Sequence, residues 1–399
     1  MTLLLKRLFI AVVCLIVLIS SFGGPSRAAE TLIIWNSLQP PMSGVLDQWL
    51  TEYPPLKDGS LGLDVRSVPH FALGEFLDNP PNGQLPDLIL ASSDAASILA
   101  ERRLLAVLDS DLSGDLRARF AQIAWDLATY ERNIVAVPLA LEGLVLYQNR
   151  ALTEDINPTI FDGLLQALES LNNADQVGLI FNLDAYSTAG LYLAEGGTYL
   201  NARGESLLEA SLNQFTRYLT TIRDLAERAK RGEFSYNSGD QAFLDGKAGF
   251  IIAPSSYLPK YQLVLGDTLQ VVGLPALKNG PWRPMVRAYQ FYVMPRTTKR
   301  AIAIDFANFA TQFGGGGQMG YGLVSARSDT IAMDALEPSV MAGVLQSGVP
   351  QPNRPEMAVV WRAMSKAIRA VVEEGVDPAV AARAAATEAK EGILALRTQ

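Results

Sequence analysis

The stretch Ile134–Arg150, IVAVPLALEGLVLYQNR, decides the fold, because it holds two apolar runs around a single carboxylate. Short apolar runs bounded by turn residues are typical of buried strands. We therefore predict strands over residues 134–138 and 143–149. Glu142 lies in the short segment between them, and a carboxylate in such apolar surroundings needs a hydrogen-bonding partner.

Short apolar strands and amphipathic helices alternate on both sides of this stretch. The pattern predicts further strands over residues 32–35, 63–68, 88–90, 177–181, 249–253, 269–274 and 288–294. It predicts helices over residues 42–53, 161–171, 207–230, 301–312, 356–374 and 378–396, and one that begins near Asp94. The last helix has Asp377 as its N-cap and Pro378 at its first position. This order indicates an α/β fold with a largely parallel sheet, in which ligands bind at the carboxyl ends of strands.

Composition excludes several classes of function. The 399 residues suffice for two or three domains, and 33 Lys and Arg stand against 41 Asp and Glu, for a net charge of −8. Nucleic acid is therefore not an expected partner. With one His and one Cys in the whole chain, a zinc site of the Cys or multi-His kind is excluded, and we expect no metal and no cofactor. A Ser-His-Asp triad would have to use His70, which we expect at the surface or at a helix cap.

The N-terminus has the organisation of a secretory signal peptide. Lys6 and Arg7 precede the apolar run 8–19, and Ser26-Arg27-Ala28 forms a small-x-small cleavage site. Cleavage after Ala28 removes three basic residues and Cys14 but no acid, so the mature charge becomes 30 − 41 = −11. We expect a periplasmic or extracellular protein. A retained anchor would need about 20 apolar residues, and the residues before Cys14 do not resemble a lipobox.

Several fragments, in their order, resemble the extracellular solute-binding proteins of ABC importers, of the family 1 maltose and maltodextrin type. The fragments are Leu32–Asn36, Pro86–Leu90 with Leu104-Leu105, Pro138–Gly143 leading to Tyr147–Arg150, Ala194–Gly197, Phe243–Ala248, and Gln351-Pro352 with Pro355. The resemblance implies a monomeric, non-catalytic carrier with the type II periplasmic-binding-protein fold. Such a carrier holds a mono-, di- or short oligosaccharide between two hinged lobes and delivers it to transmembrane permease subunits.

The resemblance also implies where the chain crosses between the lobes. The first crossing is expected at Leu139–Gly143 and the second near Pro284–Tyr289. The lobes are then discontinuous in sequence. One would comprise residues 29–140 plus 285–328, and the other residues 141–284 plus 329–399.

Carboxylates and aromatic rings are the expected sugar contacts, because charge-assisted hydrogen bonds suit hydroxyls and ring faces suit the apolar side of a sugar. Asp94 matches a ligand-binding Asp of the family, and its alternative role is to cap the helix that follows. For Glu142 the alternative to ligand contact is a structural bond within the hinge. Asp184 and Tyr186 match an acid and a stacking aromatic of the family. The full set of expected ligand-binding residues is Asn36, Ser37, Gln39, Ser92, Ser93, Asp94, Glu142, Asp184, Tyr186, Tyr257, Tyr289 and Gln290.

The chain also departs from the maltodextrin pattern, which leaves other functions open. Ala91 occupies the position of one aromatic platform, and Ser255-Ser256-Tyr257 falls at another, which argues against long maltodextrins. A secreted glycoside hydrolase would also use carboxylates and aromatic rings. A phosphosugar or glycerol-phosphate binder would need basic residues, for which Arg283 and Arg287 are candidates, although we expect both at the solvated surface. A membrane-anchored sensor requires that the signal peptide is retained.

Overall fold

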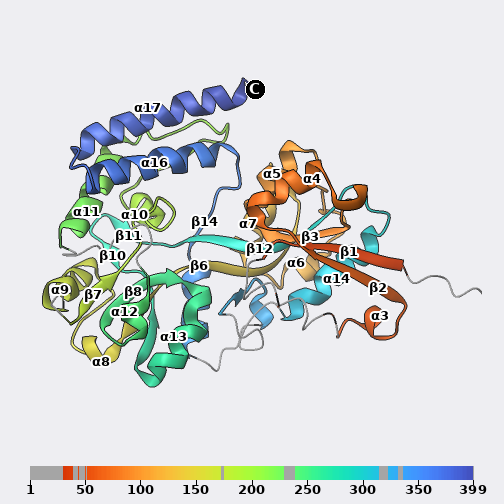
Figure 1. Ribbon diagram of the computed structural model, residues 1–399, viewed down its shortest axis with the longest axis horizontal. Helices are drawn as coiled ribbons and strands as arrows, with labels where there is room; N and C mark the ends of the chain where they lie inside the picture. Colours follow the sequence, from red (N-terminus) through yellow and green to blue (C-terminus); the bar gives the residue numbers. More distant parts are fainter. Residues whose placement is uncertain are drawn as a thin grey trace, which may run out of the picture.

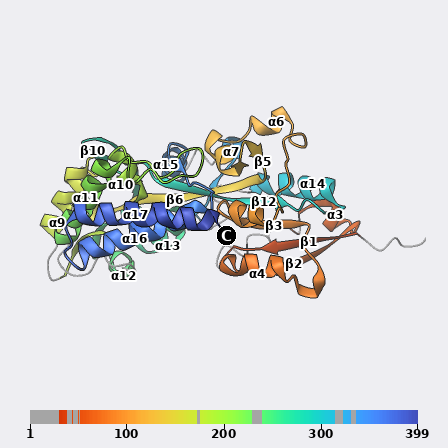
Figure 2. The same ribbon diagram turned by 90° about the horizontal axis from the view of Figure 1, so that it is seen from above.

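Two long antiparallel strands, β6 (Val137–Asn149) and β12 (Met285–Val293), run side by side through the middle of the molecule (Figures 1 and 2). The structure is a computed structural model, and it describes residues 30–38, 44, 50, 52–171, 175–228, 239–313, 322–330 and 336–398. Every residue of β6 is buried. Its first half pairs with β12, and its second half pairs with β8 (Ala248–Pro254) and β9 (Leu269–Val272). The prediction of two strands, 134–138 and 143–149, is therefore wrong, because one continuous strand connects the two halves of the molecule.

The strands form one sheet in the order β2-β1-β3-β12-β6-β8-β7. At one end β1 (Glu30–Asn36) pairs in parallel with both β2 (Leu61–Ser67) and β3 (Leu88–Ser92). At the other end β7 (Val177–Ile180) pairs in parallel with β8. In between, β12 is antiparallel to both β3 and β6. The expected largely parallel sheet is thus a mixed one, and its antiparallel centre is formed by the two long strands.

The helices cover this sheet as two separate lobes (Figure 1). The first lobe carries α3 (Pro54–Lys57), α4 (Leu73–Asp78), α5 (Ala95–Glu101), α6 (Gly114–Arg117), α7 (Gln122–Ala128) and α14 (Arg300–Ala310). The second carries α8 (Arg150–Thr153), α9 (Phe161–Leu171), α10 (Ala189–Ala194), α11 (Leu212–Arg228), α12 (Gln241–Leu244), α13 (Leu258–Leu265), α16 (Glu356–Val372) and α17 (Pro378–Arg397). The α/β fold of two lobes joined by crossing strands is the expected one.

A further segment, residues 336–350, packs beside the two crossing strands. The helix α15 (Leu336–Gln346) packs against β6, β9 and β13 (Val324–Ser325), and β14 (Val349–Pro350) pairs in parallel with the start of β12. Two small hairpins complete the described strands: β4 (Thr129–Tyr130) with β5 (Asn133–Ile134), and β10 (Ala276–Leu277) with β11 (Gly280–Pro281).

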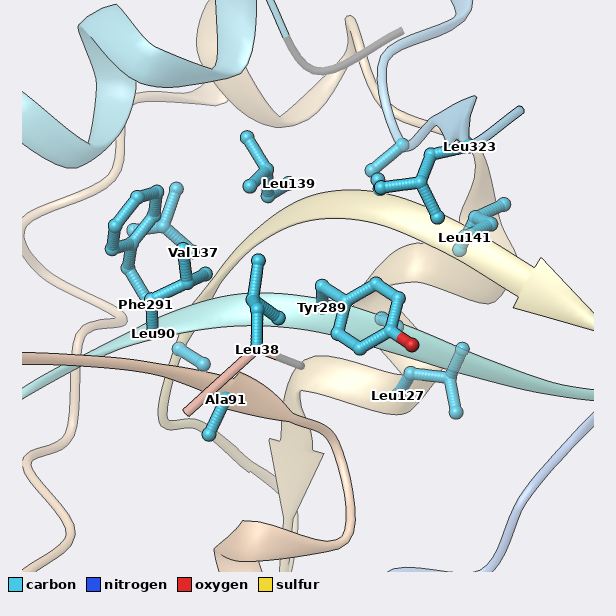
Figure 3. Packing of buried hydrophobic residues seen from close by; sticks show 14 of the residues in the cluster. Leu38, Leu90, Ala91, Leu127, Val137, Leu139, Leu141, Tyr289, Phe291 and Leu323 are labelled. Carbon is cyan, nitrogen blue, oxygen red and sulfur yellow. The ribbon is translucent and has the colours of Figure 1, made fainter. Parts of the chain in front are cut away.

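Two hydrophobic cores correspond to this arrangement. In the first, apolar side chains of β3, β6 and β12 meet beside the crossing, among them Leu90, Leu139 and Phe291 (Figure 3). The second core lies under α11, α16 and α17, where Phe215, Val360 and many small alanines are buried. No helix in the described part of the chain is long and apolar enough to span a membrane.

Several helices agree closely with the sequence prediction. The helix α9 has the predicted bounds, and Asp377 caps α17 by accepting hydrogen bonds from the amides of Ala379 and Val380 at 2.9 and 3.1 Å. The helix α11 begins at Leu212, five residues later than predicted. Most of the predicted helix 42–53 and the candidate site residue Gln39 lie outside the described residues.

Candidate functional site

The end of β3 is fastened to β12 at the crossing. The amide of Ser93 donates to the carbonyl of Ala288 at 2.8 Å, and the amide of Ala288 donates to Ser93 Oγ at 3.3 Å. Ser93 is fully buried, so this predicted site residue has a structural role. The next residue, Asp94, lies between β3 and the start of α5.

Asp94 is held by side chains and does not cap the helix that follows. It precedes α5, but its side chain accepts no capping hydrogen bond, so the capping alternative is wrong. Its Oδ1 accepts a hydrogen bond from Ser92 Oγ, and its Oδ2 lies 3.4 Å from His70 Nε2. Burial alone would raise the pKa of Asp94, but the contacts with His70 and Ser92 and the nearby charge of Arg287 lower it to about 2. Asp94 is therefore an ionised acceptor, with 40% of its side chain exposed.

Glu142 is the hub of a hydrogen-bond network at the crossing. Its Oε1 accepts from Ser256 Oγ at 2.6 Å, and its Oε2 accepts from Arg287 Nε at 2.7 Å and from the Tyr289 hydroxyl at 2.8 Å. Only 4% of the Glu142 side chain is exposed. Burial alone would raise its pKa, but Arg287 and the hydroxyl donors lower it below the usual value. The carboxylate is thus already used by the protein's own donors.

Arg287 lies beside Glu142 and between two aromatic rings. Its guanidinium lies 5.9 Å from the ring centroid of Tyr186 and 5.7 Å from that of Tyr289. The side chain is 37% exposed, and Glu142 takes Nε and Nη2, so Nη1 has no hydrogen-bond partner among the described residues. Burial acts to lower the pKa of Arg287, but Glu142 holds it well above the usual value. Arg287 is therefore half-buried and paired with Glu142, in place of the solvated surface position expected for it, whereas Arg283 is exposed as expected.

Tyr186 reaches the same place from the second lobe. It lies between β7 and α10, its hydroxyl donates to the Met285 carbonyl at 3.4 Å, and its ring meets Trp361 of α16 edge-on at 6.5 Å. Burial raises the pKa of Tyr186 to about 12, so the hydroxyl stays protonated. Asp184 turns away to a local role, because it accepts hydrogen bonds from the Ser187 amide and hydroxyl at 2.8 and 2.6 Å.

Other predicted site residues have local partners. Asn36 Oδ1 accepts from the Leu38 amide at 3.1 Å, and Ser37 Oγ donates to the Val68 carbonyl at 2.6 Å. Gln290 is fully buried and donates to the Tyr292 hydroxyl at 2.7 Å.

Tyr257 is a half-exposed ring, with 39% of its surface accessible, but it already carries a cation. The Lys260 ammonium lies 4.4 Å from the Tyr257 ring centroid and pairs with Asp240. One face of this ring is therefore not open for a sugar to stack on.

The structure brings together Asp94, Glu142, Tyr186 and Tyr289 of the predicted set, and adds three residues that sequence reasoning did not select. These are His70, Ser256 and Trp361, which bind Asp94, Glu142 and Tyr186 in turn. Ser256 is next to the predicted Tyr257, so its position in the sequence could have identified it as a site residue. His70 and Trp361 have no motif around them. No group of three or more His, Cys, Asp or Glu side chains among the described residues could hold a metal ion.

Comparisons with known proteins agree with this architecture. A maltotriose-binding protein of Pyrococcus abyssi is 26% identical in an alignment of 232 residues that covers 55% of this chain and 48% of that protein, so the match spans about half of that relative's length. A cyclo/maltodextrin-binding protein complexed with maltotetraose superposes with a TM-score of 0.78 at 19% identity, over 93% of this chain and 99% of that chain. An extracellular solute-binding protein of Staphylococcus aureus in complex with maltose gives 0.78 at 18% identity, over 92% and 98%.

These structural likenesses establish the two-lobed fold. The family model of the bacterial extracellular solute-binding proteins matches residues 81–314, which is more than half of the chain. The matched region contains β3, β6 and β12, the strands that position the site. The chain therefore belongs to the family of bacterial extracellular solute-binding proteins.

Proposed function

We propose that this protein captures a short saccharide of one to a few sugar rings at the crossing of β6 and β12, and delivers it to the permease of an ABC importer. The observation that carries the proposal is that Asp94, Arg287 and Tyr186 come together from the first lobe, a crossing strand and the second lobe. A ligand that bridges these groups would favour the closed arrangement of the lobes. The relatives that bind maltotriose, maltotetraose and maltose support the sugar class.

The chemistry of the three groups suits hydroxyls. Asp94 offers ionised acceptor oxygens, Arg287 Nη1 offers a donor, and Tyr186 offers a ring next to Trp361. Vicinal hydroxyls need such neighbouring donors and acceptors, and the apolar side of a sugar ring needs an aromatic face. With Glu142 neutralising Arg287, the site has no surplus of positive charge for a phosphate, which favours a neutral sugar over a phosphosugar or glycerol phosphate.

Hydrolysis is less well supported than binding. A glycoside hydrolase needs one carboxyl group with a raised pKa that protonates the leaving oxygen. The pKa values of Asp94 and Glu142 are both lowered, because His70 and Arg287 stabilise their ionised forms. Neither carboxyl group is suited to be that acid.

The remaining parts of the proposal follow the family. We propose that the signal peptide is cleaved after Ala28 and that the mature protein acts as a monomer in the periplasm or outside the cell. We further propose lobe boundaries at residues 29–140 plus 285–328 and 141–284 plus 329–399. Asp94 and Tyr186 are the proposed ligand contacts, joined by Arg287, while Tyr289 supports the site through its hydrogen bond to Glu142.

The test is a thermal-shift screen of the mature protein with mono-, di- and oligosaccharides, polyols and glycerol phosphates, followed by calorimetric titration of the hits. A ligand at a hundredfold excess over its Kd stabilises the native state by about 2.7 kcal/mol. We expect a short neutral sugar to raise the melting temperature and to be recovered unchanged. Stabilisation by glycerol phosphate alone, or release of hydrolysed sugar that Glu142→Gln abolishes, would contradict the proposal.

A further inference from the structure

The single histidine of the chain lies against the acceptor that the proposed ligand would use. His70 begins the short 3-10 helix His70–Ala72, which follows β2 in the first lobe. Its Nε2 lies 3.4 Å from Asp94 Oδ2, and Ser92 Oγ donates to the other carboxylate oxygen. Of the two expected positions, the helix cap is wrong, because the His70 side chain makes no capping hydrogen bond, and the surface position holds only in part, because 31% of the side chain is exposed.

These two contacts fix the orientation of the Asp94 carboxylate. A carboxylate at the start of a short helix rotates about its side-chain bonds unless each oxygen is held. Here one oxygen is held by Ser92, the last residue of β3, and the other by His70, in the short 3-10 helix that follows β2. His70 Nδ1 is buried without a hydrogen-bond partner among the described residues, so a proton on neutral His70 belongs on Nε2, facing Asp94.

Within the described part of the chain, two charged groups act on His70. Asp94 at the start of α5 favours its protonated form, and Arg287 on β12 opposes it. Glu142 on β6 pairs with Arg287 and so reduces that repulsion, and Tyr186 stays neutral. The contact with Asp94 outweighs burial and the Arg287 charge, so the pKa of His70 is raised above its usual value.

We propose that His70 is a positioning residue for the ligand: it holds the Asp94 carboxylate toward the Arg287 guanidinium and thereby couples sugar affinity to its own protonation. This inference rests on the proposed function. A protonated His70 donates a charge-assisted hydrogen bond, which is about twice as strong as the neutral one. Affinity is therefore highest below the pKa of His70 and falls as the pH rises through it, while Asp94 stays ionised throughout.

The first measurement needs no ligand. Because the chain has one histidine, untagged protein labelled with carbon-13 at the imidazole gives one titrating ring signal that needs no assignment. We expect a midpoint above 6.5, and Asp94→Asn should lower it. A midpoint at or below 6.5 in the wild type, or one that Asp94→Asn leaves unchanged, would overturn the His70–Asp94 coupling.

The second measurement is the affinity for maltose and maltotriose between pH 5.5 and 8.5. His70→Ala should weaken binding about three- to tenfold at pH 6, with less effect at pH 8.5. His70→Gln places an amide donor near the position of Nε2, so it should keep most of the affinity and remove the pH dependence. The matched control is Phe71→Ala, since Phe71 follows His70 and is 90% exposed.

The outcomes separate the two proposals. If wild-type protein binds no sugar of the thermal-shift panel at any pH, the proposed function fails and the coupling fails with it. If sugars bind but His70→Ala leaves the affinity and its pH profile unchanged, the positioning role alone is overturned. Equal losses for His70→Ala and Phe71→Ala would also overturn it, because they would show a general disturbance of the loop.

Discussion

Glu142 and Arg287 are register partners on two antiparallel strands, and the Glu142 carboxylate accepts hydrogen bonds from both Nε and Nη2 of the Arg287 guanidinium. The pair locks β6 to β12 at the place where both strands pass between the lobes. The guanidinium of the same pair lies 5.9 Å from the ring centroid of Tyr186. One carboxylate thus both joins the two crossing strands and holds the cation of the proposed ligand site in place.

Replacing Glu142 with Gln should destabilise the ligand-free protein. The change keeps the volume but leaves the Arg287 charge without its carboxylate, and a hydrogen bond to a charged group contributes about 1.5 to 3 kcal/mol. We expect the free energy of unfolding to fall by about 1 to 3 kcal/mol, measured by denaturant titration. The control is Glu209→Gln, whose partner Lys390 is exposed and which should lower the stability far less than Glu142→Gln does. An unchanged stability together with a tenfold loss of sugar affinity would show instead that Glu142 contacts the ligand.

Gly143, the neighbour of Glu142, should not tolerate a side chain. A Cβ at this position would lie 2.8 Å from Leu345 Cδ2 of α15 and 3.1 Å from the Met285 carbonyl oxygen. Gly143→Ala should therefore cost about 1 to 3 kcal/mol of stability through overpacking. In a double-mutant cycle, Leu345→Ala should relieve part of this cost, because it removes one of the two clashing groups.

The control for this cycle is Gly343→Ala, because Gly343 lies on α15 together with Leu345. Nothing lies within 4 Å of a Cβ at Gly343, and alanine is the better helix former, so this variant should be stabilised by up to about 1 kcal/mol. Strictly additive losses for Gly143→Ala and Leu345→Ala would show that the two side chains do not compete for the same space.

Most elements of the fold could be predicted because their periodicity is local. The apolar run of β3 and the spacing of α9 follow from neighbouring residues alone. The interpretation of β6 as two strands failed because Pro138 and Gly143 resemble strand ends. In the structure Pro138 pairs with Gln290, the register shifts between Gln290 and Tyr289, and the strand continues past this irregularity. Only the partner strand β12 determines that continuity.

The acidic residues of the candidate site could be predicted from the sequence, but the residues that bind them could not. Asp94 follows a buried strand and Glu142 interrupts an apolar one, and both are visible in the sequence. Arg287 lies 145 residues from Glu142, and nothing near it in the sequence distinguishes it from an exposed arginine such as Arg283. Which donor meets which acid depends on the strand order of the sheet.

The pair of Asp94 and His70 should give stability a specific pH dependence. The pKa of Asp94 is lowered to about 2, so its contribution is present above its unfolded value of 3.8 and is lost as the pH falls toward 2. The pKa of His70 is raised, so its contribution is present below 6.5 and is lost as the pH rises through the folded value. The stability difference between wild type and Asp94→Asn should be largest between about pH 4 and 6.5, measured by calorimetric melting. A difference that stays constant from pH 2.5 to 8.5 would contradict the pairing.

Variants of Trp361 should show whether this ring supports the proposed ligand site as well as the fold of the second lobe. Its ring meets Tyr186 at 6.5 Å and Tyr199 at 5.1 Å, so it connects the proposed sugar-facing ring to the aromatic core of the second lobe. Trp361→Ala leaves Tyr186 without this neighbour and should lower both stability and sugar affinity, whereas Trp361→Phe keeps an aromatic edge and should lose less of each.

The matched control is Tyr199→Phe, which removes the hydroxyl bonded to the Ala189 carbonyl at 3.0 Å but leaves Tyr186 in place. This control should cost about 1 kcal/mol of stability with no change in Kd. Melting curves of the ligand-free variants beside calorimetric titrations give both quantities, and a Kd for Trp361→Ala equal to that of the wild type would remove Trp361 from the ligand site.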